Sequence, residues 1–224
     1  MPRAVASADA VLAAVLKRRE ALGRTTTVAV SGVDCAGKST LAGWLRERLD
    51  ERGAPVVVLA GDDFLRPRAE RRANADQALG YYRESFDYGA LFREVLLPAR
   101  RGKRVDVRLQ VADERDRPRE RRVVVEPGSI VLAEGVFLLA GARRSAFDLA
   151  VWIEIALDDA LARARRRPFD LARYGGADGV EREYPRRFLA GQRLHLEFDR
   201  PGARADVVVS AEHLPAPPGI SATA

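Results

Sequence analysis

The sequence predicts an α/β fold with a five-stranded parallel sheet and helices on both of its faces. Five short runs of β-branched and apolar residues alternate with segments of helical spacing, which is typical of a parallel sheet covered by crossover helices. The first run leads through a glycine-rich loop directly into a helix. With 224 residues, the chain is long enough to bury the core of one such domain.

A local sequence pattern predicts each helix and strand. The first helix has apolar residues at helical spacing and ends at Gly23, and the second is also amphipathic and ends at Gly53. Residues 105–128 alternate on both sides of a charged, proline-containing turn, which predicts an inserted β-hairpin. The expected strands are 25–31, 55–60, 129–135, 148–157 and 205–210, and the expected helices are 8–22, the segment between the glycine-rich loop and Gly53, most of 85–102, 158–167 and about 180–198.

These elements divide the chain into an N-terminal helix over residues 1–24, one domain over 25–210 and a tail over 211–224. The tail is rich in proline, which predicts a flexible segment. The apolar run near the N-terminus is interrupted by Asp9 and followed by basic residues, which is the wrong order for a signal peptide. No later run reaches the length of a membrane span, so a cytoplasmic protein without a membrane partner is expected.

The composition narrows the class of partner. A hydrophobic content of 47% with 31% charged residues is ordinary for a soluble globular protein. The net charge of +6 suits anionic ligands, but basic and aromatic residues are not interleaved as they are in nucleic-acid binders. Cys35 is the one cysteine, which excludes an internal disulfide and a cysteine-based metal site. We therefore expect a small-molecule partner and no nucleic acid; a homo-oligomer is compatible with the sequence.

The glycine-rich loop has the spacing of a phosphate-binding loop. Gly32, Gly37, Lys38 and Ser39 match G-x-x-x-x-G-K-[ST], with a strand before the loop and a helix after it. The glycines let successive backbone N–H groups point at phosphate oxygens, and Lys38 adds a compact positive charge. Ser39 is expected to help to hold Mg²⁺. The residues expected to bind the nucleotide are Gly32, Val33, Asp34, Cys35, Ala36, Gly37, Lys38, Ser39 and Thr40.

Acidic residues follow two further strands. Asp62 and Asp63 come directly after the second strand, where a carboxylate can accept a proton from a substrate hydroxyl or hold a metal ion. A turn or a helix cap is the alternative for this pair. Glu134 ends the third strand after a fully apolar run, and a carboxylate there is costly unless it faces a cation, which favours a place near Mg²⁺.

The order of these motifs resembles the uridine kinase-like branch of P-loop kinases, which includes nicotinamide riboside kinase and, more distantly, phosphoribulokinase and pantothenate kinase. The resemblance covers about residues 25–210. It is carried by "SGVDCAGKSTLA", "GDDF", "YYRESFDYGAL", the hairpin, "VLAEGVFLL", the arginine-rich stretch over 158–170 and "GQRLHLEF…ADVVVS". It implies a P-loop NTPase fold with an inserted hairpin and an arginine-rich lid, and the ATP- and Mg²⁺-dependent phosphorylation of a hydroxyl, usually the 5′-hydroxyl of a nucleoside.

The resemblance also implies roles for individual residues. Asp62 matches the catalytic base and first acid of an Asp-x-Phe motif, with Phe64 beside the substrate, and it is also a candidate metal ligand. Glu134 matches the acid that works with Ser39 around Mg²⁺. Asp87 matches the aspartate that binds the ribose diol, although a helix N-cap is the alternative.

Basic residues complete the expected nucleotide site. Arg163 and Arg167 fall where lid arginines close over the phosphates, with Arg165 and Arg166 as alternatives. Arg204 lies in a stretch that resembles the loop beside adenine.

One departure concerns the acceptor. Uridine kinases carry a tyrosine and a histidine in the hairpin that recognise the pyrimidine, whereas "VDVRLQVADE" has no aromatic residue and no histidine. Tyr81 and Tyr82 are candidates to stack on a ring instead, with a place in the core as the alternative. The expected function is a nucleoside kinase. A kinase of a non-nucleoside alcohol, such as a sugar, a vitamin precursor or a secondary metabolite, and a regulatory ATP-binding module are the alternatives.

Overall fold

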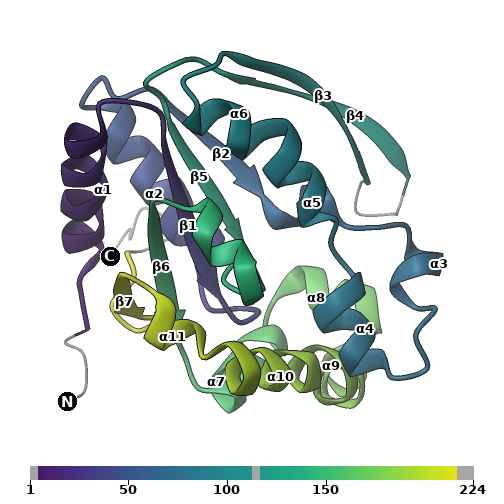
Figure 1. Ribbon diagram of the computed structural model, residues 1–224. Helices are drawn as coiled ribbons and strands as arrows, with labels where there is room; N and C mark the ends of the chain where they lie inside the picture. Colours follow the sequence, from purple (N-terminus) through teal and green to yellow (C-terminus); the bar gives the residue numbers. More distant parts are fainter. Residues whose placement is uncertain (1–4, 113–116, 216–224) are drawn as a thin grey trace.

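The sheet has the predicted five parallel strands (Figure 1). The computed structural model describes residues 5–112 and 117–215. The strand order is β2-β5-β1-β6-β7, and every neighbouring pair is parallel. The strands are β1 (Thr26–Gly32), β2 (Val56–Ala60), β5 (Ile130–Gly135), β6 (Leu149–Glu154) and β7 (Val207–Ser210). The predicted fold class is therefore confirmed.

Helices cover both faces of this sheet. The N-terminal helix α1 and the helix α2 pack on one face, and the segment from α5 to α6 lies on the other (Figure 1). Helices α4, α8, α9 and α10 gather beyond the carboxyl ends of the strands. The bounds are α1 (Ala8–Leu22), α2 (Lys38–Asp50), α3 (Arg68–Arg71), α4 (Gln77–Glu84), α5 (Tyr88–Ala90), α6 (Leu97–Arg100), α7 (Leu157–Ala164), α8 (Pro168–Tyr174), α9 (Ala177–Tyr184), α10 (Ala190–Asp199) and α11 (Pro201–Arg204), with short 3₁₀ segments η1 (Gly61–Phe64) and η3 (Gly141–Ala146).

Two expected helices are interrupted. The π-helical turn η2 (Leu91–Leu96) lies between α5 and α6, and a second one, η4 (Pro185–Leu189), lies between α9 and α10. A π-turn inserts one residue into the helical repeat, so apolar spacing alone does not reveal it. The strand expected over 148–157 ends at Glu154, because α7 already begins at Leu157.

The two ends of the chain join the same core. Val11, Leu12 and Val15 of α1 are buried in it, and Ala6 forms a parallel bridge to Val209. Past β7, residues 211–215 remain close to the domain, whereas 216–224, for which flexibility was expected, lie outside the described residues. In the part of the chain that the structure describes, no helix combines the length and apolar character needed to cross a bilayer.

The predicted hairpin is confirmed as the antiparallel pair β3 (Val105–Ala112) and β4 (Pro118–Val125). Its apolar residues Val105, Leu109 and Val123 are buried against the domain. Arg121 fastens it to the end of β2, because its guanidinium pairs with Asp63 and donates a 3.0 Å hydrogen bond to the Val58 carbonyl. Asp63 therefore has a partner in the hairpin.

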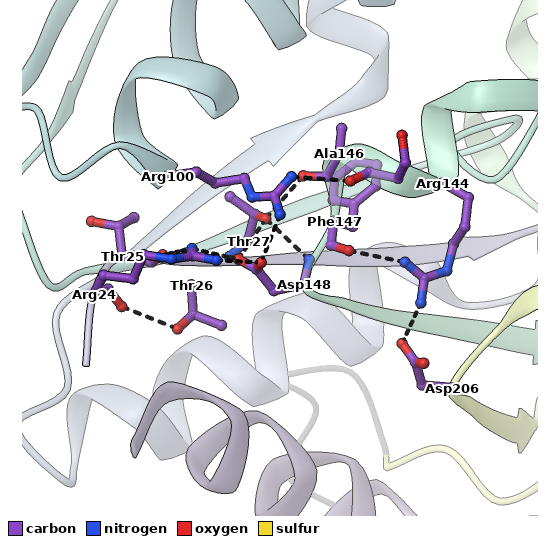
Figure 2. Close-up of polar contacts among 11 residues, drawn as sticks. Arg24, Thr25, Thr26, Thr27, Arg100, Arg144, Ala146, Phe147, Asp148 and Asp206 are labelled. Atoms are coloured by element: carbon purple, nitrogen blue, oxygen red, sulfur yellow. Dashed lines mark hydrogen bonds and ion pairs between the residues drawn. The ribbon is translucent and has the colours of Figure 1, made fainter. Parts of the chain in front are cut away.

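A cluster of ion pairs fastens the opposite end of the sheet, where β1 and β6 begin (Figure 2). The carboxylate of Asp148 accepts hydrogen bonds from both terminal nitrogens of Arg24, at 2.8 and 3.0 Å, and from the backbone and hydroxyl of Thr27. Arg100 lies 3.1 Å away. Burial alone would raise the pKa of Asp148, but the hydrogen bonds from Arg24 and Thr27 and the charge of Arg100 outweigh it and hold the pKa below its ordinary value.

We expect Asp148→Ala to lower the free energy of unfolding by about 3 kcal/mol, because it leaves two half-buried guanidinium groups without their shared partner. The lowered pKa means that the carboxylate stabilises the fold above the unfolded-state pKa of about 3.9. The difference in unfolding free energy between the wild type and the variant should shrink as the pH falls below that value toward the lower folded-state pKa. Urea titrations from pH 3 to pH 7 measure it.

Asp50→Ala is the matched control, since Asp50 makes an exposed pair with Arg46 at 3.6 Å. It should change stability by less than about 0.5 kcal/mol. Equal losses for the two variants would contradict the importance of the cluster.

Candidate active site

A cavity of about 320 Å³ opens at the carboxyl ends of β1, β2 and β5. Ligands bind at this edge in open α/β sheets. Most of the residues predicted from the phosphate loop and the acidic motifs meet there, together with two arginines of the lid helices. The lining residues are Asp34, Cys35, Gly37, Lys38, Ser39, Thr40, Gly61, Asp62, Glu134, Gly135, Val136, Arg163 and Arg167.

The phosphate loop is shaped by close packing at both glycines. A Cβ on Gly32 would lie 3.0 Å from the Ile153 carbonyl oxygen of the neighbouring strand. Gly37 has a φ of 99°, a conformation that strongly favours glycine, and it is the N-cap of α2. The N-terminus of α2 consequently faces the cavity, where its free amides and dipole suit phosphate oxygens. Val33 and Ala36, which were also expected to contact the nucleotide, have buried side chains and can offer it only backbone groups.

Lys38 stands at the start of α2. Its ammonium group donates a 2.8 Å hydrogen bond to the Val33 carbonyl, so the loop itself holds the side chain. The positive charge is thereby kept within the cavity. A compact ammonium fits this position, whereas the broad planar guanidinium of arginine would not.

Ser39 and Glu134 both line the cavity and contact each other. The Ser39 hydroxyl donates a 2.9 Å hydrogen bond to the Glu134 carboxylate, although the two residues are 95 positions apart. Burial raises the pKa of Glu134 above its ordinary value, against the charge of Lys38. A carboxylate in this position is stabilised by a cation. A hydroxyl and a carboxylate beside a phosphate site fit Mg²⁺, which binds through a few protein oxygens and substrate phosphates.

Two glycines let the carboxyl ends of β2 and β5 approach each other. A Cβ on Gly61 would lie 2.5 Å from the Tyr88 hydroxyl and 3.2 Å from the Cα of Gly135. The Tyr88 hydroxyl fills the gap between them and donates a 2.8 Å hydrogen bond to the Val136 carbonyl. Because Asp62 follows one glycine and Glu134 precedes the other, this contact sets the distance between the two carboxylates.

Gly61→Ala should therefore push the two strand ends apart and lower kcat about 100-fold, since small displacements of catalytic groups have effects of this size. The double variant Gly61→Ala/Tyr88→Phe should recover part of the activity, because it removes the nearest clashing atom. Initial rates of ADP formation measure both effects.

Gly202→Ala is the control, since a Cβ there meets only Trp152 at an ordinary 3.4 Å. It should leave kcat unchanged. Full activity in Gly61→Ala would show that the approach of the strands does not matter for turnover.

Asp62 lines the cavity, and its side chain is exposed there although protein atoms surround it closely. Desolvation by these atoms raises its pKa above the ordinary value, and the negative charge of Asp34 raises it further, against the charges of Lys38 and Arg167. A raised pKa makes a carboxylate a stronger base. Its placement beside Lys38 and Glu134 is therefore suited to taking a proton from a hydroxyl.

The lid contributes Arg163 of α7 and Arg167, the N-cap of α8. Arg163 donates hydrogen bonds to the carbonyls of Cys35, at 3.3 Å, and Ala211, at 3.2 Å. Arg167 lies 3.6 Å from the buried carboxylate of Asp170. The alternatives Arg165 and Arg166 do not line the cavity. The structure thus brings to the cavity both arginines that were expected to contact the phosphates.

Four predicted substrate contacts do not line the cavity. Phe64 and Tyr81 are buried in the core; Tyr81 donates a 3.0 Å hydrogen bond from its hydroxyl to Asp34. The Tyr82 hydroxyl binds Asp199 instead. Asp87 caps α5 by accepting a 3.2 Å hydrogen bond from the amide of Ala90, which is the alternative that its sequence context left open.

Arg204, expected beside adenine, is also held elsewhere. Its guanidinium donates to the carbonyls of Leu139, at 3.0 Å, and Gly141. It does not line the cavity. The role at the nucleotide base stays a prediction.

Sequence reasoning missed three residues near the cavity. Gln192 is buried and donates a 2.6 Å hydrogen bond to Asp34. Arg187 is buried and donates to Gln77, at 2.7 Å, and to the carbonyl of Arg71, at 2.9 Å. The described start of the tail also reaches the loop, because a Cβ on Gly37 would lie 2.5 Å from the Leu214 side chain. Arg187 and Leu214 belong to no motif that could have revealed them, and Gln192 lies in the stretch "GQRLHLEF", to which the resemblance assigned no residue role.

Known proteins are similar to this chain in sequence and in fold. A family model for adenylylsulphate kinase matches residues 24–83. Uridine kinase of Escherichia coli strain K12 is 25% identical over 186 residues, which cover 81% of this chain and 85% of that protein.

Among solved structures, a candidate fructose transport system kinase from Silicibacter sp. TM1040 superposes with a TM-score of 0.74 at 24% identity, covering 91% of this chain and 98% of that one. A candidate uridine kinase from Bacillus stearothermophilus superposes with a TM-score of 0.66 at 23% identity, covering 88% and 99%. Together with the phosphate loop and the acidic residues around it, these similarities support the resemblance of this chain to the uridine kinase-like P-loop kinases.

Proposed function

We propose that this protein is an ATP-dependent kinase that transfers the γ-phosphoryl group to a hydroxyl of a small molecule. The observation that carries the proposal is the meeting of Lys38, Ser39, Asp62 and Glu134 in one cavity. Asp62 and Glu134 come from the carboxyl ends of β2 and β5, and Lys38 and Ser39 come from the start of α2, the helix after β1. A regulatory ATP-binding module would need the loop but not a carboxylate beside Lys38 that can act as a base.

The residues divide the chemistry among them. The loop amides, the α2 N-terminus and Lys38 hold the β- and γ-phosphates. Ser39 and Glu134 hold Mg²⁺, which supplies charge neutralisation when bound; Asp62 is a further candidate ligand. Asp62 orients the acceptor hydroxyl and takes its proton. Arg163 and Arg167 stabilise negative charge on the transferred group. To do so, Arg163 leaves the carbonyls that it contacts in this structure, and Arg167 leaves the Asp170 carboxylate.

The proposed acceptor is the 5′-hydroxyl of a nucleoside. The uridine kinase of E. coli, similar over most of both chains, supports this assignment. A sugar is the second candidate, because the hairpin has no aromatic residue or histidine in 105–112 to read a pyrimidine, and the Silicibacter structure named for fructose superposes with the higher TM-score of the two. A panel of nucleosides, ribosides and sugars with Mg·ATP, followed by ADP release and product mass, distinguishes the two; no product with any of them would contradict a kinase.

If Asp87 binds the ribose diol as proposed, a ribonucleoside should exceed its 2′-deoxy counterpart in kcat/KM by up to about 10⁴-fold. Asp87→Ala should largely abolish that preference by impairing the better substrate. The carboxylate now caps α5 and lies 3.9 Å from Arg66, so it would have to serve both the cap and the sugar. Steady-state kinetics with both nucleosides and both proteins measure the effect.

A purely structural cap predicts a different result. Asp87→Ala would then lose about 1 kcal/mol of stability and keep its preference for the ribonucleoside.

A further inference from the structure

Asp34 is an unexpected residue for a loop that must bind a polyanion, since a carboxylate repels phosphates. Its side chain is directed to the helices beyond the loop. One carboxylate oxygen, Oδ2, accepts a 3.0 Å hydrogen bond from the hydroxyl of Tyr81 on α4 and a 2.6 Å hydrogen bond from the amide of Gln192 on α10. These helices lie beyond the strand ends with the lid (Figure 1).

Both donors are fixed by the core. The ring of Tyr81 is 5% exposed and packs edge-on against Phe137 and Phe188, at centroid distances of 5.1 and 4.8 Å. The guanidinium of Arg187 covers its face at 5.6 Å. Gln192 is 1% exposed. Two immobile donors on one oxygen hold the carboxylate in a single orientation, as a preorganised binding group requires.

The second oxygen of Asp34 is available. Among the described residues no hydrogen bond reaches Oδ1, although the side chain is half-buried and lines the cavity. A carboxylate held by one oxygen and free at the other is a hydrogen-bond acceptor for a ligand.

The charges that line the cavity separate into two groups. Lys38, Arg163 and Arg167 are the cations, and a nucleotide with three phosphates requires them. Glu134 is engaged with Ser39. Two carboxylates therefore remain for the acceptor, those of Asp62 and Asp34.

Nearby arginines offset the charge of these two carboxylates only in part, because burial and Asp34 keep the pKa of Asp62 raised against the charges of Lys38, Arg167 and Arg173. Arg187 is buried and donates to Gln77, Ser85 and a backbone carbonyl. Arg173 is exposed and stacks on Phe169 and Tyr174 on the lid.

We propose that Asp34 is an acceptor-binding residue: its Oδ1 accepts a hydrogen bond from a second hydroxyl of the acceptor while Asp62 binds the hydroxyl that reacts. The acceptor is accordingly an uncharged molecule with at least two hydroxyl groups, and carboxylated or phosphorylated acceptors are excluded by repulsion from two carboxylates. This inference rests on the proposed kinase function and holds for both a nucleoside and a sugar.

The experiment compares matched acceptors with the full chain and Mg·ATP. The pairs are a hexose and its aldonate, glycerol and glycerate, and a ribonucleoside and its 3′-phosphate. In each pair that is turned over, the uncharged member should have a kcat/KM about 100-fold higher or more, because like charges in contact cost several kcal/mol. No ADP release with any acceptor overturns the kinase function itself, whereas a preference for the anionic members overturns only the role of Asp34.

Asp34→Asn tests the residue directly, since the amide keeps the shape and loses the charge. The variant should raise KM for the uncharged acceptor and lower the neutral-to-anionic ratio by about 10-fold or more. Its Kd for a fluorescent ATP analogue, measured without acceptor, should stay within about threefold of the wild type.

Tyr81→Phe provides a second variant, because it removes one donor to Asp34 and keeps the ring. It should change the same ratio in the same direction by a smaller factor. The proposal would be overturned if the neutral-to-anionic ratio of kcat/KM were unchanged in both variants. It would also be overturned if Asp34→Asn lost as much affinity for the fluorescent ATP analogue as it lost in kcat/KM for the acceptor.

Discussion

Lys38→Ala is expected to lower kcat by about 10³-fold or more while the protein remains folded. The ammonium is the fixed positive charge of the phosphate loop, and its position is set by the 2.8 Å hydrogen bond to Val33. Loss of this charge removes stabilisation of the phosphoryl group during transfer, when negative charge develops on it. ADP release under saturating acceptor measures the effect, and a thermal melt verifies the fold.

Lys17→Ala is the matched control, because Lys17 lies on α1 outside the cavity. It should retain full activity. Near wild-type turnover in Lys38→Ala would contradict the placement of the nucleotide phosphates in this loop.

Asp62→Asn should lower kcat by about 10²- to 10⁴-fold and leave the Kd for ATP nearly unchanged, because the amide keeps the shape of the side chain but cannot take a proton. Burial and the charge of Asp34 raise the pKa of Asp62. The base must be deprotonated to act, so wild-type kcat/KM should fall as the pH drops through a value above that of an ordinary aspartate. The pH–rate profile from pH 4 to pH 8 measures this.

The neighbouring residue gives the control. Asp63 pairs with Arg121 of the hairpin and is buried, so Asp63→Asn should affect the attachment of the hairpin more than proton transfer. Its kcat should fall less than that of Asp62→Asn, and its low-pH limb should be unmoved. A larger loss of kcat in Asp63→Asn would identify the neighbour as the base.

Local patterns were sufficient to predict the strands and the loop. β-Branched runs mark buried parallel strands whatever their neighbours are, and the G-x-x-x-x-G-K-[ST] spacing reflects a backbone shape formed within a few residues. Because the carboxyl ends of parallel strands share one edge, Asp62 and Glu134 could be expected at the same site as Lys38. The structure places all three in one cavity.

Contacts between distant segments could not be predicted in this way. The hydrogen bond from Gln192 to Asp34 joins residues 158 positions apart, and neither the residue types nor their spacing predicts it. The tyrosines illustrate the same limit: adjacent residues of α4 send their hydroxyls to different partners, Tyr81 to Asp34 and Tyr82 to Asp199. The π-helical turns shift the helix faces around them, and apolar spacing does not register the extra residue.

The ion-pair cluster around Asp148 affects which substitutions the fold can tolerate. It fastens the edge of the sheet opposite the cavity, through Arg24 and Arg100 (Figure 2). The residues proposed to bind the acceptor lie at the opposite end of the strands and on the helices beyond it. They can therefore be substituted without breaking the ion pairs of Asp148. A library that randomises Asp34 and Gln192 should therefore yield many folded variants with altered acceptor preference, because the ion pairs of Asp148 still stabilise the fold in each variant.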